Sequence, residues 1–220
     1  MIHKRAGSVL VTGAALAGVL ALSAGSAVAA TNARAAATSH KVAATWTVKP
    51  GGAITAKSGT TTLKDTKSGS TLACKSSSGK GTVKQGRGLS GTKLGSITAL
   101  SFSSCTGPLS LTFTVKTTHF PWHLNATSFR NGVTTGTITG IHATLTGPSC
   151  TAVVDGTGAS ANNGKVTAKY TNSTGKLATT GAGNLHIYKV NGCAGLIGSG
   201  DGTSFKGSYT VSPKQTITSP

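Results

Sequence analysis

The chain has 220 residues and a formal net charge of +18, with 21 Lys and Arg against three acidic residues. Those three, Asp65, Asp155 and Asp201, lie in turn-like sequence and do not suggest the paired carboxylates of most glycoside hydrolases. Abundant Gly, Thr and Ser together with a lack of Glu disfavours surface helices and favours short strands joined by turns.

The first 29 residues have the three parts of a secretory signal peptide. Lys4 and Arg5 form a basic head, an apolar run extends from about Val9 to Leu22, and the small residues 27–29 fit a cleavage site. The apolar run is short for a retained membrane helix, which needs about 18 residues or more. We therefore expect a secreted, extracellular protein without a transmembrane anchor after cleavage, starting near Ala30 with a flexible Ala-rich leader at 30–41.

Residues 42–216 are predicted to form one domain of short strands, followed by a tail at 217–220. Alternating apolar and polar residues predict the strands, and turn signals such as Asn131-Gly132 separate them. In chain order the predicted strands are 43–48, 53–57, 70–75, 95–103, 110–117, 124–129, 133–138, 141–145, 151–154, 165–172, 185–190 and 204–211. One apolar face per strand predicts an all-β fold, either an antiparallel β-sandwich or a small closed barrel.

Four cysteines behind a signal peptide predict two disulfides: Cys74, Cys105, Cys150 and Cys193. Zinc is the rival interpretation, but the spacing contains no C-x2-C knuckle. Cys105 and Cys193 each end an alternating strand in a Cys-x-Gly sequence, whereas Cys74 and Cys150 each precede a polar, Gly-containing turn. This similarity suggests two halves, about 42–117 and 118–216, and favours the pairs Cys74–Cys105 and Cys150–Cys193. Chance similarity between Gly- and Thr-rich strands is the alternative.

Basic residues are concentrated in the first half of the mature chain. Removal of Lys4 and Arg5 leaves nineteen, of which eleven lie between Arg34 and Lys93. One interpretation is a site for a polyanion such as an anionic cell-wall polymer or polysaccharide, with the candidate contacts Lys75, Lys80, Lys84 and Arg87. The alternative is that lysines protect strand edges and maintain solubility. Without recognition helices or interleaved aromatics, sequence-specific nucleic-acid binding is not expected.

The segment 119–127 gathers aromatic and imidazole side chains in an otherwise aromatic-poor chain. A ligand-contact patch is one interpretation, with the candidates His119, Phe120, Trp122 and His123; a corner packed over the end of the sheet is the other. Metal binding is not predicted, because Pro121 opposes the helix that would bring the two His together. His142 and His186 are interpreted as ordinary strand positions.

No catalytic residue or cofactor site is predicted. The chain contains no G-x-S-x-G nucleophile elbow, and its three Asp are interpreted as turn residues.

Several segments resemble a group of small secreted proteins from actinomycete bacteria. The matching segments are 101–109 (SFSSCTGPL), 120–125 (FPWHLN), 136–141 (GTITGI), 170–175 (YTNSTG) and 211–218 (VSPKQTIT). The resemblance implies secretion and disulfide bonds, and it carries no assigned activity.

Together these patterns predict a secreted, non-catalytic binding or structural protein at the cell envelope or in the extracellular space, with an anionic polymer as the candidate partner. The alternatives are a carrier of a small apolar ligand and a secreted hydrolase. A carrier should enclose a cavity lined by Val, Ile, Phe and Trp122. A hydrolase should present a polar cleft in which a His lies beside Ser or Asp.

Overall fold

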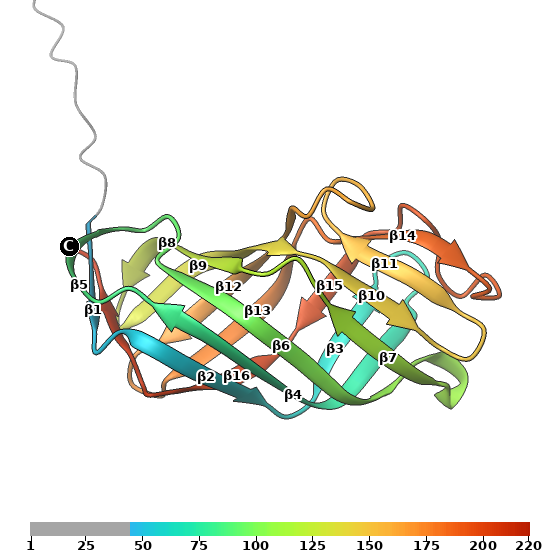
Figure 1. Ribbon diagram of the computed structural model, residues 1–220, viewed down its shortest axis with the longest axis horizontal. Helices are drawn as coiled ribbons and strands as arrows, with labels where there is room; N and C mark the ends of the chain where they lie inside the picture. Colours follow the sequence, from blue (N-terminus) through green and yellow to red (C-terminus); the bar gives the residue numbers. More distant parts are fainter. Residues whose placement is uncertain (1–44) are drawn as a thin grey trace, which may run out of the picture. The chain divides into compact units, whose positions relative to one another are not determined.

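The computed structural model describes residues 45–220, so the predicted signal peptide and leader lie outside the described residues. The described part consists of seventeen strands and one short 3-10 helix (Figure 1). They are β1 (Thr45–Lys49), β2 (Gly52–Ser58), β3 (Thr61–Asp65), β4 (Thr71–Val83), β5 (Gly86–Ser90), β6 (Gly95–Thr106), η1 (Pro108–Ser110), β7 (Thr112–Thr117), β8 (Trp122–Arg130), β9 (Val133–Ile141), β10 (Ala143–Thr146), β11 (Thr151–Asp155), β12 (Gly164–Thr171), β13 (Lys176–Gly183), β14 (His186–Asn191), β15 (Thr203–Lys206), β16 (Ser208–Ser212) and β17 (Thr216–Thr218).

Eight strands close into a ring in which every neighbouring pair is antiparallel. The order around the ring is β2, β4, β6, β8, β9, β12, β13 and β16, and β16 pairs back onto β2. The predicted all-β fold is therefore confirmed, in its closed-barrel form. Closure removes the free edges that an open sheet would leave.

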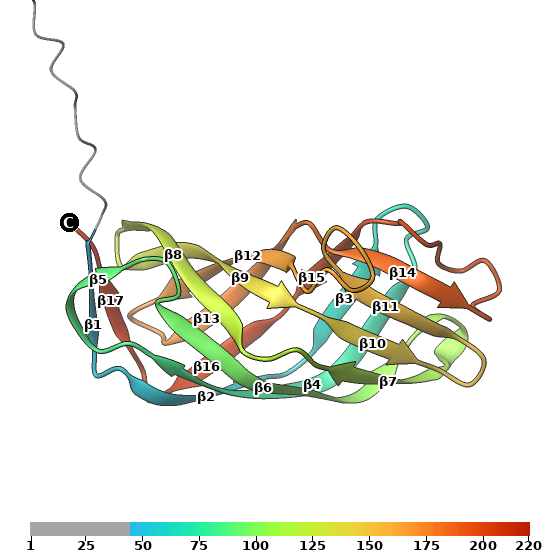
Figure 2. The same ribbon diagram turned by 45° about the horizontal axis from the view of Figure 1, so that its top comes forward.

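The long strands β4 and β6 continue beyond this ring and carry a second set of strands (Figure 2). There the order is β3, β4, β6, β7, β10, β11 and β14, with β15 paired to β3. The segment before β15 meets β14 through the bridge between His186 and Gly202, and the Thr203 N–H donates to the Leu185 carbonyl at 2.7 Å. The second set of strands thus closes as well. The barrel is an up-and-down meander of eight long strand lines, which we call staves; β4 and β6 are continuous, and each of the other six consists of two consecutive strands.

Six of the eight staves are interrupted near the middle of the barrel. Gly59 lies between β2 and β3, Pro121 between β7 and β8, and Gly207 between β15 and β16. Pro lacks the N–H that a ladder needs, and Gly has no side chain to pack in a strand. At Gly207, where the predicted strand 204–211 is divided in two, a Cβ would lie 2.9 Å from the Thr61 side chain.

A small sheet of β17, β1 and β5 covers one end of the barrel (Figure 2). Trp46 and Val48 of β1 are 2% and 0% exposed and form a core cluster with barrel residues. Ile217 belongs to the same cluster and pairs with Val48, so the expectation of a tail at 217–220 is wrong for the residues of β17.

The two disulfides have the predicted pairing. Cys74 and Cys105 face each other across β4 and β6, and Cys150 and Cys193 flank the pair β11 and β14. Each predicted half therefore contains its own bridge. The halves share one ring, because β2 pairs with β16 and β6 pairs with β8 across the division at residue 118. Their internal similarity stays a prediction.

Candidate functional site

The centre of the barrel contains an apolar cavity of about 110 Å³. Its wall is formed by inward-facing residues of both rings, among them Trp122 of β8, Val166 of β12 and Phe205 of β15. Trp122 is 4% exposed, and its indole N–H donates a hydrogen bond to the Thr118 carbonyl at 3.0 Å. The only polar group of this buried side chain therefore has a partner. The lining of Val, Ile, Phe and Trp122 is the one expected of a carrier.

The few polar side chains of the cavity wall are uncharged or point outward. Tyr209 is 5% exposed, and burial raises its pKa to about 12 even though the Ser77 hydroxyl donates to its oxygen at 3.0 Å. Lys80 borders the cavity from β4, but its side chain is exposed. The interior therefore suits a neutral, apolar molecule.

A second cavity, of about 220 Å³, lies at the end of the barrel that carries the disulfides. It shares Leu63, Leu72 and Leu145 with the central cavity, so these three side chains separate the two spaces. Its outer wall comes from the connections around η1 and around Cys193. A ligand that displaced the three leucines could extend from this end into the centre.

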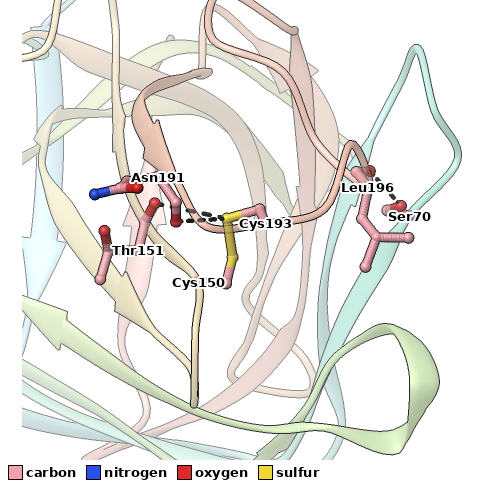
Figure 3. Close-up of a disulfide and its surroundings, with 6 residues drawn as sticks. All are labelled: Ser70, Cys150, Thr151, Asn191, Cys193 and Leu196. Atoms are coloured by element: carbon pink, nitrogen blue, oxygen red, sulfur yellow. Dashed lines mark hydrogen bonds between the residues drawn. A yellow bond between two sulfur atoms is a disulfide. The ribbon is translucent and has the colours of Figure 1, made fainter.

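The Cys150–Cys193 disulfide and a hydrogen bond from Ser70 are among the contacts that hold the connection 192–200 at this end (Figure 3). The Ser70 hydroxyl donates to the Leu196 carbonyl at 2.6 Å, which links the connection to the β3–β4 turn. Cys193 Sγ also lies 3.6 Å from the Thr151 carbonyl oxygen. Because the disulfide sulfur has no proton, this is a polar contact without a donated hydrogen.

The opposite end is closed by the small sheet and by Gln215. This side chain is 1% exposed, and its Oε1 accepts a hydrogen bond from the Gly51 N–H at 2.8 Å. The Tyr170 hydroxyl donates to the Gln215 carbonyl and accepts from the Gln215 N–H, at 2.9 and 2.8 Å. Burial raises the pKa of Tyr170, so the phenol stays neutral. Buried, hydrogen-bonded groups therefore close this end of the barrel.

The structure divides the predicted aromatic and imidazole patch. Trp122 points into the barrel, and Phe120 packs against the same core with its ring centroid 4.9 Å from that of Trp122. His119 is exposed and has a left-handed φ of 58°, and half-buried His123 neighbours Trp122 on β8. The segment thus matches the alternative interpretation of a packed corner. Of the four residues, Trp122 lines the central cavity and therefore remains a candidate ligand contact.

His142 and Asp155 form a buried pair that the sequence did not indicate. His142 Nδ1 lies 2.9 Å from Asp155 Oδ2, and the ring of His119 meets that of His142 edge-on at 4.5 Å. Backbone N–H groups of Gly156, Asn162 and Asn163 also donate to the carboxylate. Burial alone would raise the pKa of Asp155, but these hydrogen bonds outweigh it and lower the pKa.

The hydrogen-bond partners of Asp155 show what the pair does. They come from the connection between β11 and β12, so the carboxylate fixes this connection to the break between β9 and β10. Neither His142 nor Asp155 lines the cavities described above. The pair therefore has the features of a structural link. Within residues 45–220, no group of three or more His, Cys, Asp or Glu is arranged to hold a metal ion.

All four candidate polyanion contacts are exposed. Lys75 and Lys80 lie on β4, Lys84 comes directly after it, and Arg87 lies on β5. Nine residues of extended chain between Lys75 and Lys84 span about 30 Å, so the side chains form a row rather than a compact cluster. Whether this row binds a polyanion stays a prediction.

The described surface carries cationic side chains and buried carboxylates. All seventeen Lys and Arg of residues 45–220 are exposed. In contrast, Asp65, Asp155 and Asp201 are 2%, 0% and 8% exposed. One lysine forms an ion pair with one of these carboxylates: Lys67 Nζ lies 3.3 Å from Asp201 Oδ1. The charge of this surface is therefore almost entirely positive.

The sequence did not reveal the cavities or the burial of the carboxylates, because both depend on how distant strands close the ring. No helix among residues 45–220 is long and apolar enough to cross a membrane. No protein-family model, curated protein or solved structure matches this chain.

Proposed function

We propose that the protein is a secreted, non-catalytic binding protein that carries a small apolar ligand inside its barrel. The observation that carries the proposal is the central cavity, which is apolar and lined by Trp122. Protein interiors are normally close-packed, with few voids larger than a water molecule. An apolar cavity of comparable size, about 150 Å³, stays dry and binds benzene in another protein.

The free energy of an empty cavity gives the scale of the binding. At about 24 cal/mol per Å³, a void of about 110 Å³ costs roughly 2.5 kcal/mol of stability. A ligand that fills the space recovers part of this free energy, in addition to its own transfer from water. The neighbouring cavity of about 220 Å³ offers room for a longer molecule, because ligand pockets commonly enclose about 300 Å³ or more.

Secretion is supported by the signal-like first 29 residues and by the two disulfides, which persist in oxidising compartments. The non-catalytic role is supported by the state of the His142–Asp155 pair. Its carboxylate already accepts hydrogen bonds from three backbone N–H groups, and the pair lies away from the cavities. A catalytic His would need a neighbouring nucleophile and access to substrate.

Fluorescence of Trp122 provides the test. The variant Trp46→Phe leaves Trp122 as the only Trp of the chain. Bromobenzene, an apolar quencher, should quench this fluorescence with a saturable concentration dependence, whereas aqueous iodide should have little effect on a side chain that is 4% exposed. Linear quenching by bromobenzene up to its solubility limit, without saturation, would contradict a binding cavity.

A second function, attachment to an anionic polymer of the cell envelope, is supported by the exposed cations and buried carboxylates. Binding to purified wall polymer should weaken steeply between 0.1 and 1 M salt, where the Debye length falls from about 10 Å to about 3 Å. Changing Lys75, Lys80, Lys84 and Arg87 to Gln should weaken binding more than the same change at Lys165, Lys169, Lys176 and Lys189. Equal losses would show that only the total charge matters.

A further inference from the structure

Leu109 is the most exposed large hydrophobic side chain in the described part of the chain, at 79%. It lies in η1, on the connection between β6 and β7, and borders the cavity at the disulfide end. Leu109 and Ser110 both have left-handed backbones, with φ of 57° and 59°. This conformation is unfavourable for a bulky residue that is not Gly, and such strain is concentrated at functional positions.

The surroundings of Leu109 at this end include hydrophobic side chains. Leu111, Leu196 and Ile197 border the same cavity, and each is half-buried. Together with Leu109 they form an apolar cluster at this end of the barrel, and a contiguous exposed cluster of this kind can contact another apolar phase.

The charge at this end is also suited to one kind of partner. Asp65 accepts hydrogen bonds from the N–H groups of Lys67 and Ser68, and Asp201 accepts one from the N–H of Gly198. Both carboxylates are therefore buried, and Asp201 also pairs with Lys67 Nζ at 3.3 Å, while Lys64 and Lys189 are exposed on the adjoining strands. An anionic surface would meet cations here without opposing carboxylates.

We propose that the disulfide end of the barrel docks on an anionic lipid bilayer, with Leu109 inserted at the boundary of the acyl chains and the nearby lysines on the headgroups. A polar wall polymer would satisfy the lysines but would offer no apolar layer to Leu109, so the leucine favours lipid. The docking does not require the proposed ligand. If both proposals hold, the end that contacts the bilayer is also the end that contains the second cavity.

Sedimentation with vesicles tests the docking. The mature protein should bind vesicles of equimolar phosphatidylglycerol and phosphatidylcholine, and should bind pure phosphatidylcholine vesicles far more weakly. Leu109→Ser should weaken binding to the anionic vesicles about tenfold, which corresponds to about 1.4 kcal/mol. Because the side chain is exposed, the variant should melt within about 1 °C of the original protein. An unchanged affinity of this variant would overturn the proposal.

A pair of charge variants locates the contact. Lys64→Gln with Lys189→Gln removes two cations from the disulfide end, whereas Arg130→Gln with Lys214→Gln removes two from the far end. The first double variant should lose at least fivefold more affinity than the second. Equal losses, or binding to purified anionic wall polymer but not to vesicles, would also overturn the proposal. Trp122 quenching by bromobenzene needs no lipid, so a failure here is distinguishable from a failure of the ligand proposal.

Discussion

Two alanines on neighbouring strands test whether the barrel interior holds unfilled space. Ala143 of β10 lines the central cavity and pairs with Val154, whereas Ala152 of β11 lines none of the described cavities and pairs with Leu145. Both are buried, at 7% and 1% exposed, and both belong to strands, where Val is well tolerated. The substitution Ala→Val is therefore the same chemical change in two different packing environments.

The expected effects have opposite signs. At Ala143 the added methyl groups would enter the cavity, and burial of two such groups at about 0.8 kcal/mol each, less some side-chain entropy, predicts a gain of about 1 kcal/mol. At Ala152 the same groups would overpack a filled core, which typically costs about 1 to 3 kcal/mol. Ala143→Val should also weaken the binding of bromobenzene, because it occupies part of the space.

Urea denaturation of the disulfide-intact protein, followed by fluorescence, measures both effects. With an unchanged m value, the midpoint should rise for Ala143→Val and fall for Ala152→Val. A gain of about 1 kcal/mol corresponds to about 2 to 4 °C in melting temperature for a domain of this size. If both variants were destabilised equally, the interior would be filled, and the ligand proposal would lose its main support.

Two further predictions concern a carboxylate and a glycine. Because the folded pKa of Asp155 lies below its ordinary value of 3.8, its contribution to stability is complete above that pH and is lost as the pH falls through the lower folded value. Urea denaturation between pH 6 and pH 2 should therefore show a smaller acid-induced loss of stability for Asp155→Asn than for the original protein; an identical loss would contradict the assignment. A Cβ at Gly136 would overlap the carbonyl oxygen of Asn125, so Gly136→Ala should destabilise the barrel by about 2 kcal/mol or more, whereas Ala at exposed Gly59 should cost less than about 1 kcal/mol in the same assay.

The elements that could be predicted from the sequence are those with clear alternation. In β12, Val166, Ala168 and Tyr170 are buried while Lys165 and Lys169 are exposed, and the predicted strand 165–172 follows this pattern. The disulfide pairing was also predictable, because the cysteines lie at similar places in two similar segments.

In the second half of β4, which was missed, the inward positions are polar or small. The second half of β4 places Ser77, Gly79 and Gly81 toward the interior, where no apolar alternation marks them. Ser77 is nevertheless buried at 4%, because its hydroxyl donates to Tyr209 of the distant strand β16. The same lack of alternation concealed β13. These segments are strands because they pair with distant strands, and the β propensity of their own residues did not indicate it.

The link between His142 and Asp155 was missed for a related reason. Asp155 was interpreted as a turn residue, whereas it is the last residue of β11, and its burial depends on the connection that follows β11 folding back over it. His142 was interpreted as an ordinary strand position, whereas it lies in the break between β9 and β10. A single sequence contains no signal that joins the two, because thirteen residues and a strand turn separate them.

Closure of the barrel also changes how the surface lysines should be explained. Lysines protect exposed strand edges from pairing with another chain, but a closed ring has no such edges. Lys57 of β2, Lys80 of β4 and Lys169 of β12 lie on strands that are paired on both sides. Edge protection therefore cannot account for them. Solubility could be maintained by charges of either sign, and added Asp or Glu serve it better than added Lys. The exposure of all described cations together with the burial of the carboxylates is the pattern that the proposed binding to an anionic surface would require.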